Sequence, residues 1–361
     1  MAGRPFGWAA IASCPKPDSA QIGGRFIKSE EIPLYGPAGS RPEWDASIRQ
    51  QVRDLHISAL SRYEDDAYPA INIPRSVHGQ SQCIAELFGC ELIEQVSEPG
   101  LFYPVPWIQK PADLARINLK PIESSLIGQA IEFAEYAYAV TKGELAIRNP
   151  VMTGPIDGAN YILGTMQLMH WIYDEPEALH ELLEQITRII IDVVIRLNSK
   201  TDGTICPDHG SCLPRGFALC SEVRSLLSVS MYEEFESPYL RRIGKACGPY
   251  MIHSCGTWER MLPVDIKDEN LVMVNFQTKE MNLKKVYDYT QGQLSLYVGE
   301  SINLGDQYTW PCETDFYRHL MSAFPEAVPL SFSIKDMDKY LQAQEELHGG
   351  TAGMFRWRIN P

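Results

Sequence analysis

The feature that most constrains the fold is an alternation of strand-like and helix-like segments along the 361-residue chain. Short apolar runs bounded by Gly, Pro, Asn or Asp predict strands, and longer segments with apolar residues at helical spacing separate them. Eight strand candidates cover residues 68–74, 100–108, 144–155, 203–210, 249–253, 270–276, 294–300 and 328–334.

This alternation is typical of a mainly parallel sheet whose strands are connected by helices. Eight units favour a closed (β/α)8 TIM barrel over an open, doubly wound sheet. No GxGxxG motif follows the first strand candidate, which also speaks against a dinucleotide-binding fold. Residues 15–45 are rich in Pro, Gly and charged side chains. We therefore expect an irregular N-terminal extension over residues 1–45 and a single barrel domain over residues 46–361.

Charge and cysteine content narrow the classes of partner and compartment. Acidic residues outnumber basic ones by 46 to 32, and no basic stretch is visible, so we expect no nucleic-acid partner. The chain has no run of 18 apolar residues and no secretory signal pattern, so we expect a cytoplasmic protein without a membrane span. Nine scattered cysteines, an odd number, argue against a disulfide framework and leave some thiols available as metal ligands.

The segment "PYMIHSCG", residues 249–256, places His253 and Cys255 two positions apart where a strand candidate ends. Side chains at positions i and i+2 of a strand face the same side. Imidazole nitrogen and thiolate sulfur are common zinc donors, and Gly256 lets the backbone turn away. The alternative is a polar pair at a strand end without a ligand. A catalytic zinc takes about three protein ligands, so a third must come from elsewhere.

Active-site groups of a barrel lie at the carboxyl ends of its strands and in the loops that follow. Cys312, in "GDQYTWPCETDF", lies in the loop after the seventh strand candidate and is our first candidate for the third ligand. Cys206, in "CPDHGSC", is the rival, and its loop would bring Asp208 and His209 to the barrel mouth as candidate catalytic groups. Glu300, which ends "LSLYVGE", is a candidate contact to the substrate or the metal.

Further polar candidates follow two other strand candidates. The segment "NIPRSVHGQSQ" after the first strand offers Arg75 and His78 as substrate-binding side chains. Asp157 and Asn160 lie at the start of a predicted helix after a Gly-Pro turn. Capping of that helix is one role for these residues, and contact with a substrate at the barrel mouth is the other.

Three segments in this order resemble the uroporphyrinogen decarboxylase superfamily: "RNPVMTGPIDGANYILG", "MYEEFESPYLRRIG" and "PYMIHSCG". The resemblance extends over most of the chain from about residue 45. In that superfamily a Gly-Pro turn leads into a helix that carries a Tyr, and Tyr161 stands at the matching position, six residues after Pro155. The resemblance implies the barrel fold and a place for Tyr161 in the active-site pocket.

The superfamily has two main branches. Its decarboxylases are metal-free and use an N-terminal Arg motif and an Asp after the first strand, and this chain has neither. The other branch resembles corrinoid-linked methyltransferases, whose zinc is bound by His-x-Cys and a more distant Cys. His253 and Cys255 match that pair. The third Cys of this branch lies near the last strand, whereas "VPLSFSI" has none and Cys312 comes earlier.

The resemblance therefore implies a zinc-dependent methyltransferase. It would move a methyl group between a corrinoid (cobalamin), supplied by a separate carrier protein, and a thiol, a folate-like compound or a methylated small molecule. A metal-free decarboxylase or lyase acting on a small carboxylated substrate is the alternative. A barrel that only binds a metal or a partner is a third reading.

Overall fold

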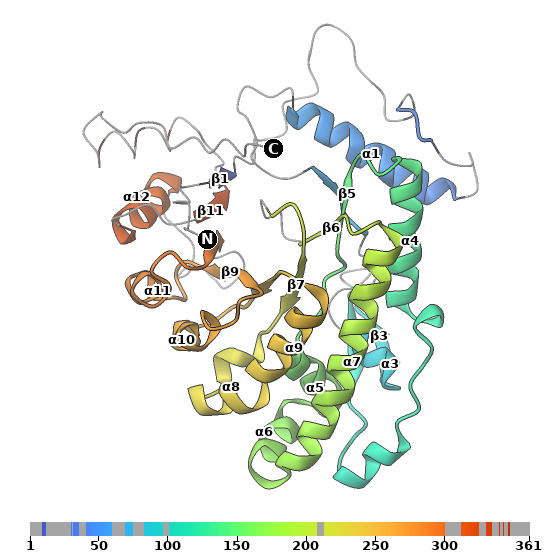
Figure 1. The fold of residues 1–361 in the computed structure, drawn as a ribbon, viewed down its shortest axis with the longest axis vertical. Helices are drawn as coiled ribbons and strands as arrows, with labels where there is room; N and C mark the ends of the chain where they lie inside the picture. Colours follow the sequence, from blue (N-terminus) through green and yellow to red (C-terminus); the bar gives the residue numbers. More distant parts are fainter. Residues whose placement is uncertain are drawn as a thin grey trace, which may run out of the picture.

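The computed structural model describes residues 9–11, 30, 32–35, 41–59, 69–74, 83–96, 101–207, 213–299, 312–324, 330–333, 339, 342 and 346. Strands occupy the middle and helices surround them, as the sequence predicts for a (β/α)8 barrel (Figure 1). One sheet has the order β2-β5-β6 and the other β7-β8-β9-β10-β11-β1, and every pairing within these two sheets is parallel. The strands are β1 (Ala9–Ile11), β2 (Ala70–Ile71), β5 (Ala146–Arg148), β6 (Ile205–Cys206), β7 (Phe217–Cys220), β8 (Tyr250–His253), β9 (Leu271–Gln277), β10 (Ser295–Gly299) and β11 (Leu330–Ser333).

The helices follow the strands in the order that the alternation predicts. No helix in the described part of the chain is long and apolar enough to cross a membrane. The α-helices are α1 (Pro42–Ala59), α3 (Cys83–Leu87), α4 (Leu126–Val140), α5 (Pro155–Leu163), α6 (Thr165–Asp174), α7 (Pro176–Lys200), α8 (Val229–Phe235), α9 (Ser237–Cys247), α10 (Leu262–Asp265), α11 (Leu283–Thr290) and α12 (Glu313–Ala323). Short 3₁₀ helices are η3 (Pro111–Arg116), η4 (Ile122–Ser124), η5 (Val223–Leu226) and η6 (Glu259–Met261).

Three strand assignments differ from the expectation. The candidate at 100–108 contains β4 (Phe102–Val105), which pairs antiparallel with β3 (Glu91–Glu94) in a separate hairpin. Its alternate residues are exposed, whereas a barrel strand is buried on both faces. The missed barrel strand is β7, whose four residues are all buried but too few to give a periodic pattern. Strand β1 lies within the extension that was expected to be irregular, and it pairs with the edge of β11. The domain division at residue 45 stays a prediction.

The two sheets meet at a seam between β6 and β7. The backbone N–H of Gly216 donates to the carbonyl of Ile205 at 3.1 Å. The side chain of Asn149 adds two bonds across the seam: its Oδ1 accepts from Ala218 N at 3.0 Å, and its Nδ2 donates to Ala218 O at 3.2 Å. A buried side-chain amide therefore takes the place of a backbone ladder at this point, which leaves the buried groups of Ala218 paired.

The pleat of the strands decides which residues face the barrel lumen. Ala218, Met251 and Met273 pack together in a cluster separate from the main core, and register pairs them across β7, β8 and β9. Two residues further along the strands, the same register aligns Cys220, His253 and Asn275. The lumen therefore changes from apolar to polar at the carboxyl ends of these strands, and His253 belongs to the polar level.

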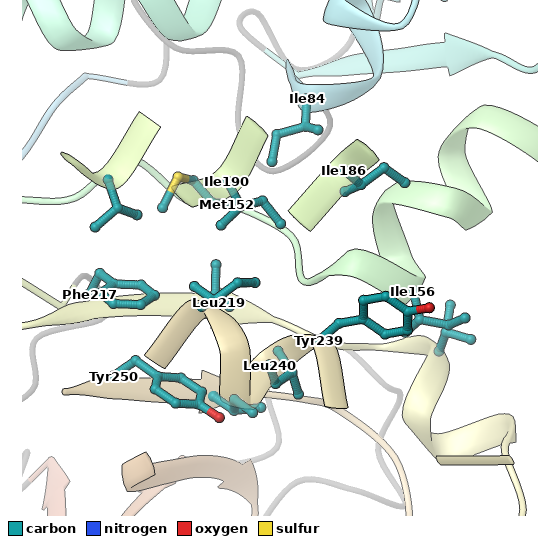
Figure 2. Close-up of a cluster of buried hydrophobic side chains, with 14 of the residues drawn as sticks. Ile84, Met152, Ile156, Ile186, Ile190, Phe217, Leu219, Tyr239, Leu240 and Tyr250 are labelled. Atoms are coloured by element: carbon teal, nitrogen blue, oxygen red, sulfur yellow. The ribbon is translucent and has the colours of Figure 1, made fainter. Parts of the chain in front are cut away.

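Helix α7 covers the outside of the barrel. Pro176 occupies its first turn, where a missing N–H costs nothing, and its apolar residues recur at three- and four-residue spacing. Ile186 and Ile190 meet Ile156 of α5 and Leu219 of β7 in one buried cluster (Figure 2). Helix α5 approaches closely, because a Cβ on Gly158 would lie 3.0 Å from Ile186. This contact fixes α5, which begins at the barrel mouth.

We expect Ile186→Ala to destabilise the protein by about 2–5 kcal/mol, because it leaves a cavity between α5 and α7 at a fully buried position. The measurement is urea unfolding followed by circular dichroism. Ile195→Ala, on the same helix but with a half-exposed side chain, is the control and should shift the free energy of unfolding far less. Equal losses for the two variants would contradict the packing described here.

Candidate metal centre

The end of strand β8 brings an imidazole and a thiol together. His253 is the last residue of the strand, and its Nε2 lies 3.6 Å from the Sγ of Cys255. The chain then turns at Gly256, whose φ of +82° favours glycine. A Cβ at that position would also lie 3.0 Å from Ser225. The turn therefore holds the thiol beside the imidazole, as the His-x-Cys spacing indicates.

A carboxylate joins this pair from the neighbouring strand. Glu222 follows β7, and its Oε1 lies 3.1 Å from His253 Nε2. Its other oxygen, Oε2, accepts the backbone N–H of Cys255 at 2.7 Å. One ligand atom from each of Glu222, His253 and Cys255 lies within 4.8 Å of the others. The group therefore has the size and the donor types of a metal-binding site.

The tautomer of His253 is set by its other nitrogen. Asn275 donates its Nδ2 to the carbonyl of Tyr297 at 2.7 Å, which leaves its Oδ1 as the acceptor for Nδ1–H of His253. In the neutral imidazole, Nε2 then presents a lone pair toward Glu222 and Cys255. Three electron-rich atoms facing one another require a cation or a proton between them. A fixed Nδ1–H partner of this kind is common among histidines that bind zinc.

The electrostatics of the site also favour positive charge. Burial alone lowers the pKa of His253, but the Cys255 thiol and the Glu222 carboxylate outweigh it and raise the pKa well above its ordinary value. Burial alone raises the pKa of Glu222, but the imidazole of His253 and the N–H of Cys255 lower it overall. The side chain of Glu222 is 41% exposed and that of His253 only 12%, so the group opens to solvent on the Glu222 side.

Sequence analysis missed Glu222. It lies directly after β7, the strand that was too short to recognise, so "CSE" (220–222) was not placed at a strand end. The sequence did offer one signal. Glu222 follows a short apolar run, and the next strand along the chain is the one that ends in the His-x-Cys loop. In a barrel of consecutive parallel strands, these two loops are neighbours.

The candidates on α5 have different surroundings. Asp157 is buried in the first turn, and its two carboxylate oxygens accept the backbone N–H groups of Glu222 and Val223 at 2.7 and 2.8 Å. Asn160 has a buried Oδ1 without a hydrogen-bond partner among the described residues. Tyr161 is partly buried against the main core. Roles in substrate binding or catalysis for these three residues stay predictions.

Both candidate third cysteines lie within the described part of the chain. Cys312 is exposed at the start of α12, and Cys206 is buried at the end of β6. Neither belongs to the converging group, which instead has Glu222 in the third position. The remaining candidates lie outside the described residues: Arg75, His78, Asp208, His209 and Glu300.

A buried arginine supports the turn that carries Glu222. Arg224 is fully buried, and its Nη1 donates to Asp265 Oδ2 at 3.2 Å and its Nη2 to the hydroxyl of Tyr232 at 3.0 Å. The guanidinium also lies 4.9 Å from the ring centres of Tyr232 and Trp258. Paired and stacked in this way, a buried cation fixes η5 firmly behind the candidate ligands.

Glu236 completes this network from the start of α9. The Ser221 hydroxyl donates to its Oε1, while its Oε2 has no hydrogen-bond partner among the described residues. Burial raises the pKa of Glu236 to about 7, and the nearby Asp265 carboxylate adds to the rise, although Arg224 at 4.0 Å and the Ser221 hydroxyl lower it. The folded protein therefore holds a proton on Glu236 that the unfolded chain releases at lower pH.

We expect Glu236→Gln to flatten the loss of stability as pH rises. Between the unfolded pKa of about 4.5 and the folded pKa of about 7, ionisation favours the unfolded chain, by about 3 kcal/mol in total. The glutamine keeps an acceptor for Ser221 and cannot ionise. The measurement is the free energy of unfolding from pH 4.5 to 8 for the wild type and the variant. Glu234→Gln, at an exposed position on α8, is the control, and an unchanged pH slope in Glu236→Gln would refute the assignment.

Fold and site together define a (β/α)8 barrel with a candidate metal centre at its mouth. The sequence pattern of the uroporphyrinogen decarboxylase (URO-D) family matches residues 81–295, more than half of the chain. The protein belongs to this family.

Two named proteins are similar to parts of the chain. A methylated-thiol–coenzyme M methyltransferase of Methanosarcina mazei is 27% identical over 130 residues, which are 36% of this chain and 32% of that protein. The match thus spans about a third of this relative. The solved structure of a methyltransferase from Methanosarcina mazei superposes with a TM-score of 0.58 and 14% identity, over 84% of this chain and 86% of the other. At that identity the superposition shows the shared fold.

Proposed function

We propose that the protein is a zinc-dependent methyltransferase that moves a methyl group between a corrinoid and a thiol or methylated small molecule. The observation that carries the proposal is the convergence of Glu222, His253 and Cys255 at the barrel mouth. The family match and the methyltransferase names of both relatives support the reaction class. The corrinoid would come from a separate carrier protein that docks at the mouth.

The three side chains fit zinc by the chemistry of their donors. An imidazole nitrogen whose other nitrogen is held by Asn275, a thiol and a carboxylate are all zinc ligands, and the thiol disfavours Mg²⁺ and Ca²⁺. Three protein ligands leave a fourth position for a substrate, as catalytic zinc sites do. We propose Glu222 as the third ligand in place of Cys312.

Zinc, when bound, would supply Lewis acidity that keeps a coordinated thiol deprotonated at neutral pH. The protein's own residues orient the candidate ligands. Asn275 fixes the ring of His253, and the turn at Gly256 brings the thiol of Cys255 toward that ring. The more exposed Glu222 side leaves an entry for the small molecule. The corrinoid, when bound, would supply or accept the methyl group, and the residues around the candidate zinc site would hold the thiol that exchanges it.

We expect about one zinc per chain in the purified wild type, and its loss in His253→Ala and Cys255→Ser. Glu222→Gln should weaken zinc binding at least tenfold, because it removes a charged ligand. Metal content by mass spectrometry, followed by competition with a chromogenic chelator, measures both effects. Cys312→Ser and Cys206→Ser should bind zinc as the wild type does. Loss of zinc in Cys312→Ser instead would restore that residue as a ligand, and a wild type that takes up no zinc would favour a metal-free lyase.

Methyl transfer itself is tested with methylcobalamin and a panel of small thiols. We expect the absorbance of the methyl–cobalt bond to decay with the wild type and to persist with His253→Ala. Methylated thiol, detected by mass spectrometry, should appear in equal amount. A zinc-loaded wild type that leaves every thiol unmethylated, and that also fails to methylate cob(I)alamin from methylated thiols, would refute the proposal.

A further inference from the structure

We infer that Asp157 is a positioning residue for the candidate metal centre: it fixes the backbone of Glu222 so that the Glu222 carboxylate faces His253 and Cys255. This inference rests on the proposed function. It assigns to Asp157 a role other than contact with the substrate, and it explains how Glu222, which lies beyond the end of β7, can hold a defined place.

The first step is the attachment of α5 to the end of β7. The backbone N–H of Gly154 donates to the carbonyl of Cys220 at 2.7 Å, and the N–H of Cys220 donates to the carbonyl of Met152 at 2.7 Å. Helix α5 begins at the next residue, Pro155. The start of this helix is therefore tied to the residue two positions before Glu222.

The side chain of Asp157 makes a second attachment between α5 and the segment that carries Glu222. Asp157 lies in the first turn of α5, and only 2% of its surface is exposed. Its Oδ2 accepts the N–H of Glu222 at 2.7 Å and its Oδ1 accepts the N–H of Val223 at 2.8 Å. These N–H groups open the short helix η5, where the helix itself offers no acceptor. Both carboxylate oxygens are thus bound to the backbone of the segment that carries the candidate ligand.

The segment that carries Glu222 is also attached to β8, on the side opposite α5. The N–H of Ser221 donates to the carbonyl of His253 at 2.8 Å, which joins the segment to β8. The Glu222 backbone is therefore held from β8 on one side and from α5 on the other. Its side chain leaves this fixed point and meets His253 Nε2 and the Cys255 N–H. Without Asp157, two buried N–H groups lose their partners, and the segment loses the constraint on the α5 side.

Asp157→Asn tests the inference, since it keeps the volume and one acceptor oxygen but turns an NH₂ group toward one of the two N–H donors. We expect zinc affinity to fall by about 10- to 100-fold, which is the usual effect of removing a group that orients a metal ligand. Co²⁺ serves as a spectroscopic probe: the thiolate-to-cobalt band of Cys255 should remain, while the ligand-field bands should move to those of Glu222→Gln.

Asp113→Asn is the matched control. Asp113 is also buried and also accepts two backbone N–H groups of a 3₁₀ turn, those of Gln109 and Lys110, but η3 carries none of the candidate ligands. This variant should keep the zinc affinity and the Co²⁺ spectrum of the wild type. Melting temperatures of both variants show whether they are folded at the titration temperature.

The outcomes distinguish a failure of the positioning role of Asp157 from a failure of the proposed zinc site. Weak zinc binding in Asp157→Asn with the spectrum of Glu222→Gln, beside an unchanged Asp113→Asn, supports the inference. Wild-type affinity and spectrum in a folded Asp157→Asn overturn the positioning role while leaving the zinc site intact. Equal losses in both variants also overturn it, because the effect would then be general. A wild type that binds neither Zn²⁺ nor Co²⁺ refutes the proposed function itself.

Discussion

The parallel register of β7, β8 and β9 is the constraint on which the rest of the site depends. It aligns Cys220, His253 and Asn275 at one level of the lumen, so the imidazole receives its hydrogen-bond partner from the adjacent strand. A shift of one residue in any of these strands would turn the side chains toward the helices. The apolar cluster of Ala218, Met251 and Met273 below, together with the helix-facing core, opposes such a shift.

Two buried carboxyl groups lie near that level, and burial raises the pKa of both, that of Asp157 to about 8 and that of Glu236 to about 7. Asp157 accepts the backbone N–H groups of Glu222 and Val223, and Glu236 accepts the Ser221 hydroxyl. Both are bound to the segment of residues 221–223, so the more exposed Glu222 is supported by groups that solvent does not reach. The family match agrees with the barrel fold, and the candidate metal centre lies at the carboxyl ends of its strands, where barrel enzymes carry their active sites.

Sequence reasoning recovered what periodicity and local motifs carry. Seven strand candidates contain barrel strands, and His253 and Cys255 lie side by side as their spacing predicts, while their role as metal ligands stays a prediction. It could not recover Glu222, because that residue's place depends on β7, whose four buried residues give no period. It also assigned 100–108 to the barrel, since an apolar run does not reveal whether one face or both will be covered. Cys312 was chosen because its loop follows the seventh strand candidate, and only the tertiary arrangement shows that, among the described residues, it lies outside the group of Glu222, His253 and Cys255.

The seam at Asn149 joins the two sheets by means other than a uniform ladder. Where β6 meets β7, one backbone bond and the two bonds of the Asn149 amide stand in place of regularly spaced hydrogen bonds. Nearer the mouth, Met152 and Gly154, in the segment that leads from β5 to α5, form backbone hydrogen bonds with Cys220 at the end of β7. The segment that leads into α5 therefore also fastens one sheet to the other, so a change at the start of this helix reaches both the barrel wall and the candidate metal centre.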